Sequence, residues 1–98
     1  MPPAQNPLTD LAELLDQAGL DNTTVERNTH GHILIRLAPD DTAALARLLN
    51  LDDAWSLAWD LPPLGIRHIT CCITPEISVL TLTDGNARHL ATRIRYAQ

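Results

Sequence analysis

The chain has no phenylalanine and no lysine, and its three aromatic residues are Trp55, Trp59 and Tyr96. Without phenylalanine the core has to be built from other apolar side chains, and we expect mainly leucine, isoleucine, valine and alanine. All seven basic residues are arginine. That usage suggests a GC-rich genome and does not indicate a mechanism.

The chain also has few cysteines and no long hydrophobic run. No segment approaches the roughly 18 consecutive apolar residues that indicate a membrane-spanning helix, and no positively charged, apolar leader is present. The two cysteines, Cys71 and Cys72, are adjacent. Because neighbouring side chains of a strand point to opposite faces, they cannot easily form a disulfide with each other. Free thiols are typical of a reducing compartment, so we expect a cytoplasmic protein.

The 98 residues carry a net charge of −5, which is unevenly distributed. Residues 1–60 contain ten acidic side chains and three arginines, whereas residues 61–98 contain two acidic side chains and four arginines, so the two parts carry −7 and +2. Because phosphates repel an acidic chain, general binding of nucleic acid is disfavoured. A basic protein partner, self-association of the acidic and basic parts, and plain solubility all fit this distribution.

Residues 31–50 predict a strand that runs directly into an amphipathic helix. Ile33, Ile35 and Leu37 recur at a period of two, which places them on one face of a strand. Pro39 follows, and proline suits the first turn of a helix because its missing N–H would be unpaired there. The leucines and alanines after it recur at helical spacing.

A fainter copy of this pattern occurs in residues 79–94, with Leu82 in the place of Leu37. Either a duplication or the geometry that every strand-to-helix unit shares explains the repeat. A β-rich run precedes each copy, at residues 23–27 and 66–73. The sequence therefore predicts two ββα units side by side.

A helix is also expected before the two units. Asn6 is suited to cap it, Pro7 to open it, and Gly19 to end it in a left-handed conformation. The segment Leu51–Leu61 is ambiguous, since its apolar residues fit both a short helix and a strand.

These elements predict one α+β domain over residues 1–98, with residues 1–5 disordered. Two ββα-like units follow the N-terminal helix, and their four-stranded antiparallel or mixed sheet packs with helices. In the second β pair, alternation puts Ile69 on the same face as Cys71 and Ile73, but the other face is also partly apolar. We therefore expect both faces to be covered, by the first helix or by a second copy of the chain.

The histidines and cysteines invite interpretation as a metal site. His30 and His32 lie near an expected hairpin turn, and His68 and Cys72 are spaced to share one face of a strand; imidazole and thiolate both bind zinc. However, the sequence has no CxxC, HExxH or paired ligand motif. We expect exposed or structural histidines, no metal and no cofactor.

No pattern of catalytic residues stands out. The carboxylate pairs Asp40–Asp41 and Asp52–Asp53 occur at expected helix starts, where stabilisation of the helix end explains them. Neither cysteine belongs to a nucleophile motif, and no glycine-rich phosphate loop occurs. We therefore expect no catalytic residues and no enzymatic activity.

Four residues are the candidates for binding: Trp55, Trp59, Arg88 and Arg95. Tryptophan dominates many protein interfaces, although in a chain without phenylalanine both tryptophans also suit the core. The two arginines line the polar side of the last helix, 84–96, where they can meet phosphates or an acidic partner. They can equally complement the dipole at the end of that helix.

Together these features favour a small, acidic, non-enzymatic protein-binding module that acts through protein contacts, as a homodimer or with another protein. A modulator encoded by a phage or another mobile element fits this description. The alternative is a nucleic-acid-binding protein that uses the arginine-bearing C-terminal helix. A metal-dependent enzyme that uses His30, His32 and His68 is a third and weaker hypothesis.

Overall fold

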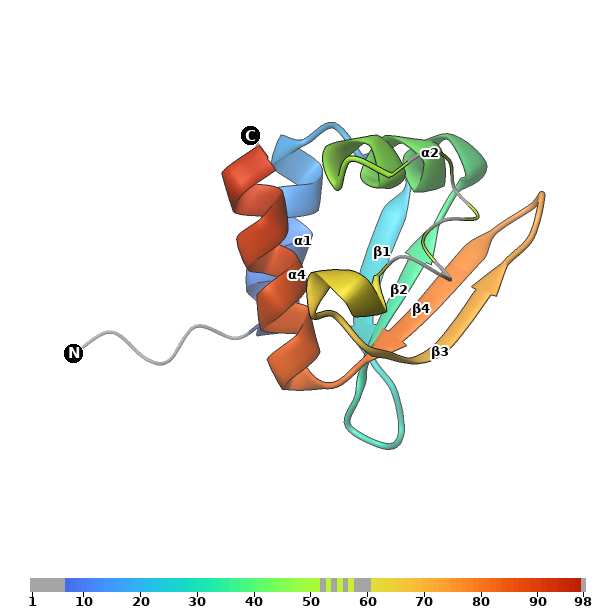
Figure 1. Ribbon diagram of the computed structural model, residues 1–98. Helices are drawn as coiled ribbons and strands as arrows, with labels where there is room; N and C mark the ends of the chain where they lie inside the picture. Colours follow the sequence, from blue (N-terminus) through green and yellow to red (C-terminus); the bar gives the residue numbers. More distant parts are fainter. Residues whose placement is uncertain (1–6, 52, 54, 56, 58–60, 98) are drawn as a thin grey trace.

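The computed structural model describes residues 7–51, 53, 55, 57 and 61–97, which form an α+β fold (Figure 1). The class and the order of elements confirm the prediction from the sequence. Among the described residues the helices are α1 (Pro7–Gln17), α2 (Pro39–Leu48), a short 3₁₀ helix η1 (Pro62–Leu64) and α4 (Asp84–Ala97), and the strands are β1 (Thr23–Arg27), β2 (Ile33–Leu37), β3 (His68–Ile73) and β4 (Ser78–Leu82).

Several predictions concern other parts of the chain. The disorder of residues 1–5, the cap at Asn6 and the position of Trp59 lie outside the described residues. So do residues 52, 54, 56 and 58–60, on which the choice between helix and strand for Leu51–Leu61 depends. Within the described residues, every helix is too short or too polar to cross a lipid bilayer.

The sheet is antiparallel throughout, in the order β1-β2-β4-β3. The elements β3, β4 and α4 each begin 45 residues after β1, β2 and α2. Ile35 pairs with Leu80 in the two central strands, and these two residues are also 45 positions apart. The two ββα units are therefore related by a pseudo-twofold axis that passes between Ile35 and Leu80.

One face of the sheet forms the core together with the helices. Burying each large aliphatic side chain contributes roughly 1.5–3 kcal/mol to stability. The largest fully buried side chains in the described residues are all leucine or isoleucine, as expected without phenylalanine: Leu11, Leu15, Ile33, Ile35, Leu37, Leu45, Leu57, Leu61, Ile66, Leu80, Leu82 and Leu90.

The helices end where the sequence places their stop signals. Gly19 has φ 89° after α1, and the N–H of the buried Leu20 donates to the carbonyl of Leu15 at 2.9 Å. Asn50 takes the equivalent left-handed position after α2, with φ 59°. Asparagine tolerates this conformation better than most other residues, so both helices close with the same motif.

A β-bulge at the start of β3 changes which side chains reach the core. His68 pairs with Leu82 and Thr70 pairs with Thr81, which leaves Ile69 without a partner in β4. Ile69 is 46% exposed as a result, although simple alternation placed it with the core-facing residues.

Asp41 connects the start of α2 to the start of β1. Its carboxylate is buried, and Oδ2 accepts hydrogen bonds from the Asn22 N–H and the Thr23 hydroxyl, both at 2.8 Å. Ala38 supplies no side-chain cap to the same helix. Asp41 therefore joins two segments of the fold in addition to placing a charge at the helix start.

We expect Asp41→Ala to lower the free energy of unfolding by about 2–3 kcal/mol, because two hydrogen bonds to a buried carboxylate are lost. The matched control is Asp40→Ala, which removes the same charge from the same helical turn at an exposed position and should cost less than about 1 kcal/mol. Urea unfolding followed by circular dichroism measures both. Equal losses would show that Asp41 acts only on the helix dipole.

Candidate functional site

An apolar pocket of about 250 Å³ lies between the start of α2 and the turn that joins β3 to β4. Trp55 forms part of its wall and is 56% exposed. Pockets for drug-sized ligands usually measure roughly 300–1,000 Å³, so this one suits one or two side chains of a protein better than a cofactor. The other residues that line it are Pro39, Thr42, Ile73, Thr74, Pro75 and Ser78.

Ser78 contributes an unpaired hydroxyl to this pocket. It is 1% exposed, and its Oγ has no hydrogen-bond partner among the described residues. By contrast, the nearby Thr42 hydroxyl donates to the carbonyl of Ala38 at 2.9 Å. A buried hydroxyl without a partner costs roughly 1–3 kcal/mol, so Ser78 is the group in this pocket that gains most from a polar atom brought by an occupant.

The pocket lies at the ends of β3 and α2, the counterparts of β1 and α4. Helix α1 packs against β1 and α4, and the counterparts of those two elements are β3 and α2 (Figure 1). The ends of β3 and α2 line the pocket. Leu57 and Leu61 are buried. The space between the ends of β3 and α2, here named the Trp55 pocket, is therefore bounded by the counterparts of the two elements that α1 contacts.

The outer face of the sheet, on the side away from the helices, carries two rows of side chains across the strands. Its charged members, Arg36 and Glu26, form an ion pair with each other at 3.2 Å. The hydroxyls of Thr70 and Thr81 are hydrogen-bonded at 2.8 Å. The outer face is therefore neutral overall, and its rows run Thr24-Arg36-Val79-Cys72 and Glu26-Leu34-Thr81-Thr70.

Two predictions about the second β pair, β3 and β4, can now be compared with the structure. Helix α1 packs on β1 and α4, so the expectation that it covers the second β pair is wrong, while coverage by a second copy stays a prediction. Cys72 lies on the outer face, whereas His68 pairs with Leu82 on the inner face. The prediction that His68 and Cys72 share a face is wrong because the bulge adds a residue between them.

Strand β3 is an edge strand, and no strand of the described part of the chain pairs with its outer side. From Ile69 to Ile73, no described hydrogen bond connects that side to another part of the chain. The strand contains no acidic or basic residue other than His68, and no proline. The opposite edge strand, β1, ends in Glu26 and Arg27 and contacts α1. Because charges and covering helices are what normally prevent strand addition, β3 is the more accessible edge.

The two predicted arginines have different surroundings on α4. Arg95 donates from Nη2 to both carboxylate oxygens of Asp10 at 3.0 Å, and this pair connects α4 to α1. The guanidinium of Arg88 is exposed and has no partner among the described residues. Neither arginine lines the Trp55 pocket, so the structure does not bring the predicted binding residues into one site.

The histidines of the metal hypothesis do not form a ligand cluster. The rings of His30 and His32 lie 6.3 Å apart at the β1–β2 turn, where Asn28 Oδ1 accepts the backbone N–H of both residues. No group of three or more histidine, cysteine or acidic side chains within the described residues is arranged to hold a metal ion.

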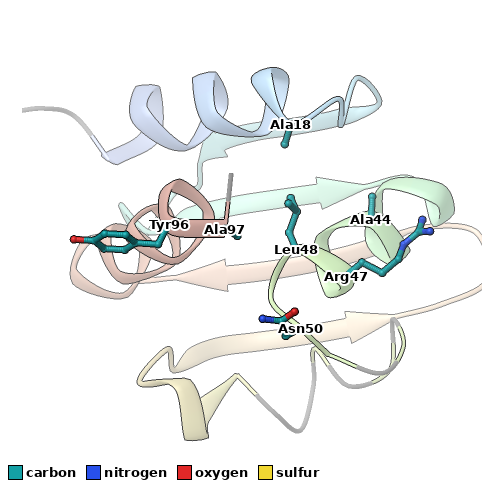
Figure 2. Close-up of a pocket in the computed structure, with 7 residues that line it drawn as sticks. All are labelled: Ala18, Ala44, Arg47, Leu48, Asn50, Tyr96 and Ala97. Atoms are coloured by element: carbon teal, nitrogen blue, oxygen red, sulfur yellow. The ribbon is translucent and has the colours of Figure 1, made fainter.

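A second cavity, of about 560 Å³, lies where the ends of α1, α2 and α4 meet (Figure 2). Figure 2 shows the side chains of Tyr96 and Arg47 on opposite sides of Leu48, pointing away from one another. These two long polar side chains do not converge on a common ligand. The ends of three helices also place carbonyl groups around this cavity, which disfavours an anion.

Comparison of the chain with protein-family models, with curated proteins and with solved structures finds no match.

Burial raises the pKa of the Cys71 thiol, and the neighbouring Cys72 raises it further. Each cysteine can be measured alone, Cys71 in the variant Cys72→Ser and Cys72 in the variant Cys71→Ser. We expect Cys71 to react with a thiol reagent at pH 8 at least about tenfold more slowly than Cys72, because the thiolate is the reactive form. The difference should narrow as the pH rises through the pKa of Cys71. Stopped-flow labelling measures it, and equal rates at pH 8 would contradict the burial of Cys71.

Arg95→Ala should lower the free energy of unfolding by up to about 1 kcal/mol, because the pair with Asp10 is lost. Arg88→Ala, on the exposed side of the same helix, should leave stability unchanged. Thermal unfolding at low and high salt measures both, and the loss in Arg95→Ala should shrink as salt rises. A salt-independent loss would mean that the arginine stem, and not its charge, stabilises the helix pair.

Proposed function

We propose that this protein is a small, acidic, non-enzymatic protein-binding module that works as a homodimer. The observation that carries the proposal is Trp55, which is more than half exposed at the wall of an apolar pocket. Leaving that much indole in water is unfavourable, and a protein surface that covers it removes the cost. Tryptophan is among the residues that most often dominate the energy of a protein interface.

Two further features support a second copy of the chain as the partner. The outer face of the sheet is neutral, so it can approach another copy despite the net charge of −5. From Ile69 to Ile73, the outer edge of β3 has backbone groups that pair with no other described residue, and a strand of any sequence can satisfy them. The acidic residues are concentrated in residues 1–60, whereas β3 belongs to the part that carries +2.

The other hypotheses have less support. The Trp55 pocket is lined by hydroxyl groups and apolar groups, and its described lining contains no carboxylate, imidazole or thiol for acid–base or nucleophilic chemistry. Nucleic-acid binding through α4 is weakened because Arg95 is already paired with Asp10. Of the two predicted arginines, Arg88 is then the one that remains available to bind a phosphate.

The proposal predicts a concentration-dependent dimer in which Trp55 is a major contact. Light scattering coupled to size exclusion, from about 1 to about 500 µM, brackets a micromolar Kd. We expect Trp55→Ala to weaken the dimer at least about thirtyfold, the usual effect at an interface hot spot. Tyr96→Ala is the control, because Tyr96 is also an exposed aromatic residue but lies on α4. A wild-type protein that stays monomeric at every concentration refutes the homodimer.

A further inference from the structure

We infer that two copies of the chain join by antiparallel pairing of their β3 strands, so that the two sheets form one continuous sheet. This inference rests on the homodimer proposed above and names the element that forms it. The partner it commits to is a second copy of this chain, bound along the edge from Ile69 to Ile73.

The backbone of β3 is the first argument. An edge strand presents a row of N–H and C=O groups that point away from the sheet, and another strand is the partner that satisfies all of them at once. Ile69–Ile73 consists of threonine, isoleucine and cysteine. It contains no charged residue and no proline, the residues that normally discourage the addition of another strand. On β1, by contrast, the charged residues Glu26 and Arg27 disfavour pairing with another strand. The two edges of the sheet are therefore not equivalent, and β3 is the one suited to pairing.

Charge at the two ends of β3 indicates the orientation. Arg67 comes directly before the strand and Glu76 lies in the turn after it, and both are exposed. In antiparallel pairing, the start of one strand lies beside the end of the other. Each Arg67 then approaches Glu76 of the partner subunit, and the twofold axis makes this contact twice. Parallel pairing would instead place like charges together.

The same arrangement brings the exposed Ile69 to the Trp55 pocket. A twofold axis perpendicular to the sheet keeps the helix-covered faces of both copies on one side. With the axis near Cys71 and Cys72, Ile69 of the partner subunit lies beside Ile73 or Thr74, both of which line the pocket. The apolar side chain that the bulge exposes and the Trp55 pocket are thereby brought together.

The size of the contact sets its strength. The five residues Ile69–Ile73 at about 3.3 Å each give a paired edge of about 17 Å, which is a small interface even with Ile69 and Trp55 included. A contact of this size gives a weak association, and we expect a Kd in the micromolar range.

Lysine substitutions at the two edges test which strand pairs. Cys72 and Thr24 belong to the same row of the outer face, at the edges formed by β3 and β1, and both are exposed. Cys72→Lys puts two like charges near the twofold axis and should raise the dimer Kd at least about tenfold. Thr24→Lys adds the same charge at the other edge and should leave the Kd within about twofold. Sedimentation equilibrium at low salt measures both.

Charge reversal tests the antiparallel orientation. Arg67→Glu and Glu76→Arg should each raise the Kd about tenfold at low salt, because both contacts of the dimer become repulsive. The double variant Arg67→Glu/Glu76→Arg restores both pairs and should return the Kd to that of the wild type. Arg88→Glu, which also reverses an exposed arginine, is the control and should have no comparable effect.

The outcomes separate the inference from the homodimer itself. If the wild type dimerises but Cys72→Lys does not weaken the dimer more than Thr24→Lys does, another surface forms the interface and the pairing of β3 is refuted while the homodimer stands. If the double charge reversal fails to rescue, the antiparallel orientation is refuted. A wild type that remains a monomer refutes the homodimer and the pairing together. Circular dichroism of each variant confirms that it is folded.

Discussion

The antiparallel pairing of β2 with β4 is the interaction on which the rest of the structure depends. An isolated two-stranded hairpin is marginally stable in water, because its apolar face has nothing to pack against. Each ββα unit here offers one such hairpin and one helix, and the central pairing combines them into a sheet wide enough to bury a common core. The pairing of Ile35 with Leu80 fixes the register. A slip of one residue would turn every core side chain of one unit toward solvent.

The departures from pseudo-symmetry explain where the candidate site lies. Helix α1 packs on β1 and α4, and the Trp55 pocket lies at the ends of their counterparts, β3 and α2. The bulge adds one residue to β3 and exposes Ile69 at the same edge. Features that belong to one unit alone therefore gather along one side of the molecule.

Much of the fold was predictable because its signals are local. The period of two at Ile33, Ile35 and Leu37 places these side chains in the core, and Gly19 ends α1, so both predictions are confirmed. The repeat of the strand-to-helix pattern also predicted the two ββα units. The order of the strands was not predictable, because it depends on contacts between segments far apart in the chain. The bulge at Ile69 has no signal in this sequence. The ion pair between Arg95 and Asp10 could not be predicted without knowing that α1 and α4 are neighbours. The sequence could not show whether Trp55 is exposed or buried, since tryptophan suits both environments.

The spacing of 45 residues between the units also bears on how the chain folds. Each hairpin closes a short loop, which costs little chain entropy and is completed within microseconds for hairpins in general. The central pairing joins strands separated by most of a unit, so its loop-closure cost comes before any of the shared burial is gained. The larger loop-closure cost in this architecture therefore belongs to the central pairing and not to either hairpin.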